Sequence, residues 1–312
     1  MRAIGVQAFG GPDALELLDL PEPHAGAGEV RIAVRAATVN PTDRAIRSGA
    51  HPDVKGKADF PYVPGMEVAG VLDEIGDGAV ADLHVGDAVI AIVVPSGARG
   101  AYAQFVVVPV ESVVAAPKGA SFAEAATLPM NGLTAAQALD RLGVRPGMVV
   151  AVTGAAGAVG GYAVQLAKAA GARVVADSSD ADAALIRSLG ADHLVRRGAD
   201  VAADIRAAVP NGVDAFVNAS AQGPEVFGAV RDGGAVAAVR QYDGDTERGI
   251  ELVRVQVRPW AREQARLDAL RRQADDGVVT LRVARTFRPE DAADAHRQLE
   301  AGGNRGRLVI EF

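Results

Sequence analysis

A glycine-rich turn between an apolar run and a helix-like stretch, within residues 151–179, most constrains the fold of this 312-residue chain. Residues 148–152 form a short apolar run, which is typical of a buried strand. Apolar side chains between Val159 and Ala170 then recur three and four positions apart, which predicts a helix that ends near Gly171. A strand, a tight glycine turn and a helix in this order form the frame in which many proteins bind a dinucleotide.

The turn itself departs from the usual dinucleotide fingerprint. It reads Ala155-Ala156-Gly157-Ala158-Val159-Gly160, so alanine stands where G-x-G-x-x-G has its first glycine. Gly157 would let the backbone approach a pyrophosphate, and Gly160 would let the helix pack closely on the strand. The N–H groups at the helix start would face the anion. The candidate phosphate-binding residues are therefore Ala156, Gly157, Ala158 and Val159.

The first 110 residues and the middle of the chain differ in their apolar pattern. Short apolar runs separated by Gly, Pro and Asp turns fill the first part without a long helical period, which predicts a barrel-like β domain. From about residue 120 strand-like runs alternate with helix-like stretches, which predicts a parallel, doubly wound sheet and hence an α/β fold class. The tail adds a helix over 262–274, a strand over 278–284, a helix over 289–300 and a strand over 308–312, and these last strands could return to the first domain.

Composition narrows the class of protein further. The net charge is −7, whereas nucleic-acid-binding surfaces are basic. No apolar run reaches the roughly 18 residues of a membrane span, and the N-terminus lacks the apolar core of a signal peptide. The absence of cysteine excludes disulfides and Cys-ligated zinc. We expect a cytoplasmic globular protein with no nucleic-acid and no membrane partner.

An ordered series of short motifs along nearly the whole chain resembles the medium-chain dehydrogenases/reductases, in particular their zinc-free NADPH:quinone oxidoreductase (zeta-crystallin-like) branch. Each motif is weak alone, but the ordered set is specific. Besides the glycine-rich turn, the motifs are VNPTD (39–43), VPGMEVAG (63–70), VGDAV (85–89), GAYAQF (100–105), AATLP (125–129), GLTA (132–135), VQLAK (164–168), LGAD (189–192) and NRGRLV (304–309).

The resemblance implies a GroES-like β-barrel domain with a Rossmann domain inserted in it. We expect residues 1–120 and 279–312 to form the GroES-like substrate domain and residues 121–278 to form the dinucleotide-binding domain, with the cofactor between them. The resemblance also implies an NADPH-dependent oxidoreductase that transfers hydride to a small-molecule quinone or similar conjugated carbonyl acceptor. It further implies a homodimer that pairs the edge strands of two Rossmann domains.

The same comparison argues against a metal. Zinc-dependent relatives have a Cys where residues 40–42 lie and a His where Met66 lies. This chain has neither, and no two of its five histidines have metal-ligand spacing. We therefore expect no metal, a structural role for Glu67, and no Lewis-acid chemistry. A quinone suits such a site, because the hydroquinone anion is a tolerable product without a strong general acid.

The resemblance also suggests residues near the nicotinamide. In this family the Asn-Pro-x-Asp stretch lies close to that ring, so Asn40 is the catalytic and cofactor-binding candidate for contacting the carboxamide or the substrate. Thr127 and Thr134 match positions in the segment that lines the nicotinamide half of the cofactor. A plain turn is the alternative for Asn40-Pro41, since Asn-Pro favours turn initiation.

Three other side chains have weaker signals. Tyr102 is a second catalytic candidate because it could donate a proton, although Gly-Ala-Tyr-Ala also suits a packed barrel turn. Asn218 ends a predicted strand of the doubly wound sheet, which makes it a further cofactor-binding candidate. We expect Asp43 to form local hydrogen bonds rather than to act as a base.

The choice between NADPH and NADH depends on residues 177–179. Asp177 is 20 residues beyond Gly157, where the fingerprint expects the acidic residue that binds the NAD ribose. The family register instead puts Ser178 at the discriminating position. Adjacent strand residues face opposite ways, which would leave Ser178 and Ser179 to bind a 2′-phosphate. We expect NADPH, with NADH kept open by Asp177.

Two other functions remain open. One is reduction of conjugated enals, enones or enoyl thioesters on the same scaffold, which acceptor profiling would separate from quinone reduction. The other is non-catalytic binding of NADP(H), which would show tight cofactor binding without turnover of any acceptor.

Overall fold

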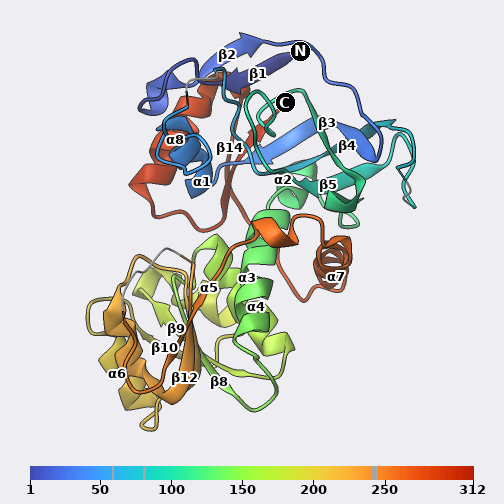
Figure 1. Cartoon of the computed structure of the whole chain (residues 1–312). Coiled ribbons are helices and arrows are strands. Elements are labelled where there is room, and N and C mark those ends of the chain that lie inside the picture. The colour runs from blue at the N-terminus through green and yellow to red at the C-terminus, as the bar shows by residue number, and fades with distance from the viewer. Residues whose placement is uncertain (58–59, 80–81, 240–244) are drawn as a thin grey trace. The chain divides into compact units, whose positions relative to one another are not determined.

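The protein, as a computed structural model, is described over residues 1–57, 60–79, 82–239 and 245–312. It divides into two compact units (Figure 1), each with its own buried apolar core. The β unit consists of Met1–Met130, Arg258–Asp275 and Leu281–Phe312. The α/β unit consists of Asn131–Val257 and Asp276–Thr280.

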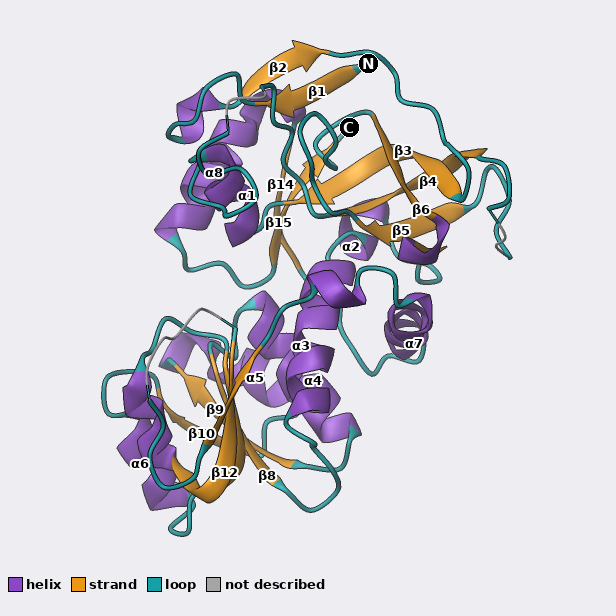
Figure 2. Cartoon of the chain, viewed as in Figure 1, coloured by secondary structure: helices purple, strands orange, loops and turns teal. Residues whose placement is uncertain are grey.

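The α/β unit is built on a six-stranded parallel sheet (Figure 2). The strand order β10-β9-β8-β11-β12-β13 means that the chain runs from β8 to one edge and then returns to β11 to build the other side. This reversal is the topological switch point at which open α/β sheets bind ligands. The strands are β8 (Val149–Thr153), β9 (Arg173–Ser178), β10 (His193–Arg196), β11 (Val213–Asn218), β12 (Val230–Ala238) and β13 (Glu251–Arg254).

Helices cover both faces of this sheet, with α4 on one face and α6 on the other (Figure 2). The spacing of apolar residues after the glycine-rich turn predicted α4, and its buried side chains include Tyr162, Leu166 and Ala167. The predicted parallel, doubly wound sheet is confirmed, whereas β10 and α6 were not predicted. The helices are α3 (Pro129–Arg141), which starts in the β unit, α4 (Ala158–Ala169), α5 (Ala183–Ser188) and α6 (Val201–Ala208).

The β unit contains a seven-stranded sheet in the order β14-β15-β3-β4-β5-β7, with β6 also paired to β3, and a separate β1-β2 hairpin pair. All pairs except β14-β15 are antiparallel. Strand β15 pairs with β3, so the last strand of the chain joins the sheet formed by the first part of the chain. The strands are β1 (Arg2–Gly5), β2 (Glu16–Asp19), β3 (Glu29–Thr38), β4 (Glu67–Ile75), β5 (Ala88–Ile92), β6 (Phe105–Pro109), β7 (Val113–Ala115), β14 (Val283–Phe287) and β15 (Arg307–Glu311).

One prediction for this part of the chain needs correction, and one short helix is added. The first 110 residues contain the seven-residue helix α1 (Pro41–Arg47), because the Asn-Pro pair that favours a turn also favours a helix start. The strand predicted over 278–284 is β14, several residues later, because Thr280 donates its N–H and hydroxyl to Gln165 of α4 instead of joining the sheet. The other helices are α2 (Phe122–Ala125), α7 (Gln264–Asp275) and α8 (Ala292–Ala301).

Within the described ranges, no helix is long and apolar enough to cross a membrane. The longest of these helices, α3, has 13 residues, fewer than the roughly 20 that a span requires.

Candidate active site

The glycine-rich turn lies at the carboxyl end of the parallel sheet, between β8 and α4. Gly157 is the N-cap residue, and α4 begins at Ala158. The N–H groups of the first helical residues have no partner within a helix, and the helix dipole adds positive potential there. The segment from Ala156 to Val159 therefore offers an anion favourable electrostatics and the N–H donors at the start of α4, whereas the Gly157 N–H donates to the Gly154 carbonyl at 2.9 Å.

Close backbone contacts explain two glycines of this segment. Gly154 has a φ of +72°, and a Cβ atom there would lie 2.6 Å from the carbonyl oxygen of Ala219. A Cβ atom at Gly160 would lie 2.2 Å from the carbonyl oxygen of Gly154. The left-handed residue of the turn is thus Gly154, one position before the fingerprint's first glycine. Alanine is tolerated at position 155 because the turn does not require a positive φ there.

Asp177, in β9, points back at this turn. Its Oδ1 accepts a hydrogen bond of 2.9 Å from the N–H of Ala155. Its Oδ2 lies 3.1 Å from Nε of Arg197, and the residue is 1% exposed. Both carboxylate oxygens are therefore engaged by donors of the protein, and Asp177 braces the glycine-rich turn.

The two serines that follow belong to a polar cluster around Arg197. The Ser178 hydroxyl donates to the Ser179 carbonyl at 2.7 Å, and the Ser179 hydroxyl donates to Asp182 at 2.8 Å. Arg197 pairs with Asp182 at 3.2 Å, and its side chain is 38% exposed. The sequence reasoning missed Arg197, which follows β10. The available signal was that neighbouring parallel strands such as β9 and β10 end side by side.

Asn218, at the end of β11, lies at the same edge of the sheet. Its Oδ1 accepts hydrogen bonds from the hydroxyls of Thr153 at 3.1 Å and Ser220 at 2.8 Å. Its Nδ2 donates to the carbonyl oxygen of Gln222 at 2.8 Å. The amide therefore holds the loop that follows β11 against the end of β8.

In the β unit, Asn40 belongs to a buried polar cluster centred on Glu67. The Oε1 atom of Glu67 accepts from Nδ2 of Asn40 at 3.1 Å, from Nη2 of Arg307 at 2.9 Å and from the Thr38 hydroxyl. Its Oε2 accepts the N–H of Met130 at 2.7 Å. Glu67 is fully buried and Arg307 nearly so. Pairing and hydrogen bonding compensate the large cost of burying these charges.

Asn40 is also the residue that precedes α1. Its N–H donates to Oδ2 of Asp43 at 2.8 Å, and Pro41 takes the first helical position. The other oxygen of Asp43 accepts the N–H of Gly65 at 2.9 Å. Burial raises the pKa of Asp43 to about 7, although these two N–H groups act to lower it. Asp43 thus ties the start of α1 to the segment before β4.

Tyr102 is fully buried in the β unit. Its hydroxyl lies 3.3 Å from Oδ2 of Asp43 and 3.2 Å from Nε2 of His296. Burial, and after it the nearby Asp43 carboxylate, raise the pKa of Tyr102 well above its usual range. The hydroxyl is enclosed by these two side chains. Tyr102 is connected to Asn40 through Asp43, because Oδ2 of Asp43 also accepts the Asn40 N–H.

Thr127 and Thr134 lie in different units. Thr127 is fully buried in the β unit, where its hydroxyl donates to the Glu124 carbonyl at 2.7 Å. Thr134 is a nearly buried residue of α3 within the α/β unit. The predicted site residues therefore form two groups. In the α/β unit, Ala156 to Val159, Ser178, Ser179 and Asn218 gather at one edge of the sheet, and in the β unit, Asn40 and Tyr102 converge on Asp43.

The surroundings of Glu67 do not fit a catalytic zinc ion. Its oxygens are already engaged by Arg307, Thr38, Asn40 and a backbone N–H. Zinc sites use Cys, His and carboxylate ligands. Within the described residues, no group of three or more His, Cys, Asp or Glu side chains could hold a metal ion.

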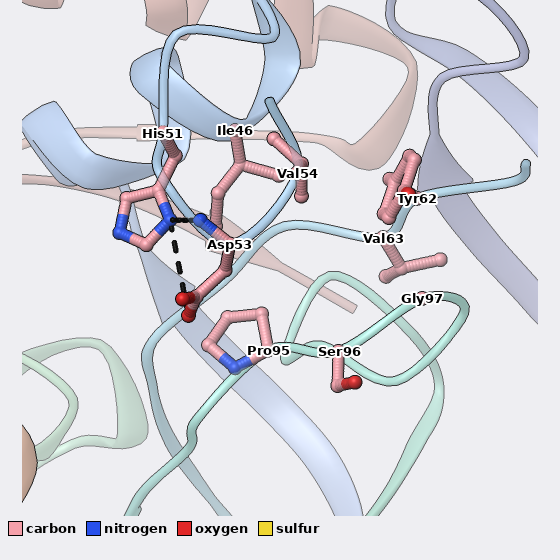
Figure 3. A pocket seen from close by; sticks show the side chains of 9 residues that line it. All are labelled: Ile46, His51, Asp53, Val54, Tyr62, Val63, Pro95, Ser96 and Gly97. Carbon is pink, nitrogen blue, oxygen red and sulfur yellow. Dashed lines mark hydrogen bonds and ion pairs between the residues drawn. The ribbon is translucent and has the colours of Figure 1, made fainter. Parts of the chain in front are cut away.

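A small pocket opens elsewhere in the β unit (Figure 3). His51 and Asp53 face one another in it, and the Asp53 N–H donates to Nδ1 of His51 at 3.2 Å. The Tyr62 hydroxyl is buried with no hydrogen-bond partner among the described residues. None of the predicted site residues lines this pocket, which is formed by Ile46, His51, Asp53, Val54, Tyr62, Val63, Pro95, Ser96 and Gly97.

Comparison with known protein families agrees with both units. Residues 26–118 match the family described as "Alcohol dehydrogenase GroES-like domain", and residues 158–250 match the family described as "Zinc-binding dehydrogenase". The β unit therefore contains a GroES-like domain and the α/β unit a Rossmann-type domain. These two domains define a dehydrogenase/reductase of the medium-chain class.

Curated relatives include quinone oxidoreductases and an enone reductase of this class. The chain is 38% identical over 205 residues to a chloroplast envelope quinone oxidoreductase homolog of Arabidopsis thaliana, which covers 62% of this chain and 60% of the relative. It is 37% identical over 177 residues to the quinone oxidoreductase of Mus musculus (56% and 51%). It is 32% identical over 250 residues to the 2-methylene-furan-3-one reductase of Solanum lycopersicum (77% and 62%). Each alignment spans less than two thirds of the relative's length.

Solved structures match over nearly their whole length. The quinone oxidoreductase of Coxiella burnetii superposes with a TM-score of 0.87 at 28% identity, over 100% of this chain and 99% of that one. The CurK enoyl reductase gives a TM-score of 0.88 at 26% identity, over 99% and 98%. The chain belongs to the medium-chain dehydrogenase/reductase superfamily, in its quinone oxidoreductase branch.

Proposed function

We propose that this protein is a zinc-independent, NADPH-dependent oxidoreductase that transfers hydride to a small quinone or similar conjugated carbonyl acceptor. Its similarity to quinone oxidoreductases supports this activity. The observation that carries the proposal is the turn between β8 and α4. There Gly154 and Gly160 bring the backbone too close for any side chain, and the start of α4 presents N–H donors.

A bound nicotinamide supplies a hydride from its C4 atom. The protein then has to bind the cofactor and the acceptor, orient them toward one another and exclude water. The turn from Ala156 to Val159 would hold the pyrophosphate through the N–H groups at the start of α4, with Asn218 at the end of β11 of the same sheet. Thr127 and Thr134 would line the nicotinamide half.

The orientation of the Asn40 side chain predicts its role. Its Nδ2 already donates to Glu67 at 3.1 Å and lies 3.3 Å from the Thr38 hydroxyl. Asn40 would therefore act through its Oδ1 atom, as an acceptor for the carboxamide N–H or for a hydroxyl of the reduced acceptor.

The bonding of Asp177 supports NADPH over NADH. An Asp that binds the NAD ribose has to reach the cofactor, whereas Asp177 is 1% exposed and its oxygens bond Ala155 and Arg197. Arg197 has five N–H donors, of which its ion pairs engage Nε and Nη1. Its partly exposed guanidinium would bind a 2′-phosphate. The Ser178 and Ser179 hydroxyls would join it after turning away from the Ser179 carbonyl and Asp182, to which they now donate.

The cluster around Glu67 supports the proposed independence from zinc. With Arg307 in ion-pair contact and no thiolate in the sequence, this cluster provides no Lewis acid. The acceptor therefore has to tolerate the charge left by hydride transfer, as quinones and conjugated carbonyls do.

Reduction of an activated carbon–carbon double bond is the second candidate function. It is favoured by similarity to the 2-methylene-furan-3-one reductase and to the CurK enoyl reductase. Both reactions place the negative charge on an oxygen, so one site could serve either acceptor.

The free edge of the parallel sheet suggests a homodimer. Strand β13 ends the strand order and pairs only with β12 among the described strands. Pairing of two β13 edges from two copies would cover their exposed N–H and C=O groups. Light scattering of the purified protein measures this directly, and a monomer at all concentrations would contradict it.

Turnover and binding measurements test the proposed activity. We expect NADPH to bind more tightly than NADH in nicotinamide fluorescence titrations. We also expect NADPH oxidation by small quinones or enones, with the Asn40→Ala variant slower by about tenfold or more. Tight binding without turnover of any acceptor would favour a non-catalytic NADP(H)-binding protein, and no binding of either cofactor would refute the proposal.

A further inference from the structure

A chain of buried hydrogen bonds links α8 to the start of α1 through Tyr102. Arg47 lies 3.2 Å from Nδ1 of His296, and Nε2 of His296 lies 3.2 Å from the Tyr102 hydroxyl. That hydroxyl lies 3.3 Å from Oδ2 of Asp43. His296, Tyr102 and Asp43 are fully buried, and Arg47 is nearly so. Arg47, the first member of this series of hydrogen bonds, also donates from Nη2 to Oε1 of Glu300 at 2.6 Å.

With Asp43 ionised, the chemistry of these groups allows only one direction for the protons. An Arg guanidinium can only donate, so Nδ1 of His296 accepts and Nε2 carries the proton. Nε2–H then donates to the Tyr102 oxygen. The proton of Tyr102 is therefore directed at Asp43, which accepts it. Every bond in this chain points toward the Asp43 carboxylate.

Asp43 passes this orientation to Asn40. The oxygen that receives the Tyr102 hydroxyl also accepts the Asn40 N–H at 2.8 Å, and the other oxygen accepts the Gly65 N–H at 2.9 Å. The carboxylate thus fixes the backbone at Asn40, while Glu67 orients its amide. Each hydrogen bond in this series forms without contact between Tyr102 and a substrate.

We propose that Tyr102 is a positioning residue: oriented by His296 and Arg47, its hydroxyl holds Asp43 so that Asn40 is fixed for contact with the nicotinamide or the acceptor. This role rests on the proposed function, in which Asn40 makes that contact. It replaces the expectation that Tyr102 donates a proton to substrate.

The charged groups around Asp43 give the proposal a pH signature. Arg307 acts to lower the pKa of Asp43 and Glu67 acts to raise it, while burial dominates and brings it to about 7. Burial, with the positive charge of Arg47, lowers the pKa of His296 to about 3, so His296 stays neutral. Only the ionised Asp43 can accept all three donors, so turnover should fall as the pH drops below about 7. Replacing Tyr102 by Phe removes a donor to the carboxylate and should move this fall to higher pH.

A double-mutant cycle with Asn40 separates positioning from general structural damage. We expect Tyr102→Phe to lower kcat about tenfold. It should cost little in the Asn40→Ala background, because Tyr102 acts through Asn40. His296→Leu should resemble Tyr102→Phe, and His296→Gln, which keeps a donor and an acceptor, should restore most of the rate. Tyr62→Phe is the matched control, since it removes a buried hydroxyl that has no partner among the described residues.

The outcomes separate this proposal from the function it rests on. Additive losses from Tyr102→Phe and Asn40→Ala, or an unchanged pH profile in Tyr102→Phe, would overturn the positioning role. If Asn40→Ala itself changes no rate, the assigned role of Asn40 fails instead.

Nitrogen-15 NMR of histidine-labelled wild-type protein tests the direction of these hydrogen bonds even if a variant does not fold. We expect His296 to stay in the Nε2–H form from pH 5 to 8. The Nδ1–H form, or titration near the ordinary histidine pKa of about 6.5, would refute the direction of the hydrogen bonds.

Discussion

The backbone N–H of Ala155 donates a 2.9 Å hydrogen bond to Oδ1 of Asp177, so the acidic residue at the end of β9 braces the glycine-rich turn. The spacing from the fingerprint, taken alone, predicts that this carboxylate binds the ribose of the cofactor. In the structure Asp177 is nearly inaccessible, and its second oxygen pairs with Arg197. The same residue type at the expected distance therefore serves a different purpose.

Asp177→Asn tests this assignment. The amide oxygen of Asn can still accept the Ala155 N–H, so the turn should persist. We expect affinity for NADH to change less than about twofold and affinity for NADPH to increase, because a negative charge is removed near the 2′-phosphate. A ribose contact would instead cost NADH affinity about tenfold, the usual loss for a charged hydrogen bond. Asp192→Asn is the control in these fluorescence titrations, because Asp192 also accepts a backbone N–H, from Val174, in the same unit.

Arg197→Gln should reverse the cofactor preference. The guanidinium is a cation that the structure adds to the predicted site, because it pairs with Asp182, which also accepts the Ser179 hydroxyl. Its loss should weaken NADPH binding about tenfold and leave NADH nearly unchanged, since a charged hydrogen bond contributes about 1.5 to 3 kcal/mol. The exposed Arg187, on α5, provides a matched Arg→Gln control. Equal losses for both cofactors would indicate that Arg197 serves only to hold Asp177 and Asp182.

Much of the fold could be predicted because its signals are local. The spacing within β8, the turn and α4 is set by neighbours in sequence, and the structure reproduces it. The local pattern around Asn40 does not distinguish a turn from a helix start, because a helix N-cap and a turn use the same residue types. A turn and a helix start are both ways in which the backbone can change direction after the end of β3.

The site partners could not be predicted, because they are distant in sequence. Glu67 and Arg307 are 240 positions apart, and Tyr102 and His296 are 194 apart. Neither Arg307 nor His296 belongs to a local pattern that signals a buried partner. Only the return of the last strand and helix to the β unit brings them together.

Two glycines of the turn should respond differently to alanine. A Cβ atom at Gly160 would lie 2.2 Å from a backbone oxygen, whereas at Gly157 the nearest atom is 3.1 Å away. Gly160→Ala should destabilise the protein by about 1 to 3 kcal/mol, as overpacking does. Gly157→Ala should fold normally and lose affinity for NADPH, because its Cβ would stand where the pyrophosphate approaches. Urea unfolding and cofactor titration of both variants measure this, and unchanged binding in Gly157→Ala would argue against a pyrophosphate at this turn.

The buried pair Asp43 and His296 should affect stability in opposite directions as the pH changes. The pKa of Asp43 rises from 3.8 to about 7 on folding, so between these values the folded state binds the extra proton and stability falls with pH. The pKa of His296 drops from 6.5 to about 3, so there the unfolded state binds the extra proton and stability rises with pH. From about pH 4 to 6.5 the two contributions cancel.

His296→Gln should expose the contribution of Asp43 alone. Gln keeps a donor and an acceptor but does not titrate, so the stabilising rise with pH is lost. Relative to wild type, the variant should lose about 1.4 kcal/mol of unfolding free energy per pH unit between about pH 4.5 and 6.5, the value of one proton. Urea unfolding of both proteins at pH 4.5, 5.5 and 6.5 gives this difference directly, because all other titrating groups are shared. A difference that stays constant across this range would mean that His296 titrates alike in the folded and unfolded chain, and that its ring is not held neutral between Arg47 and Tyr102.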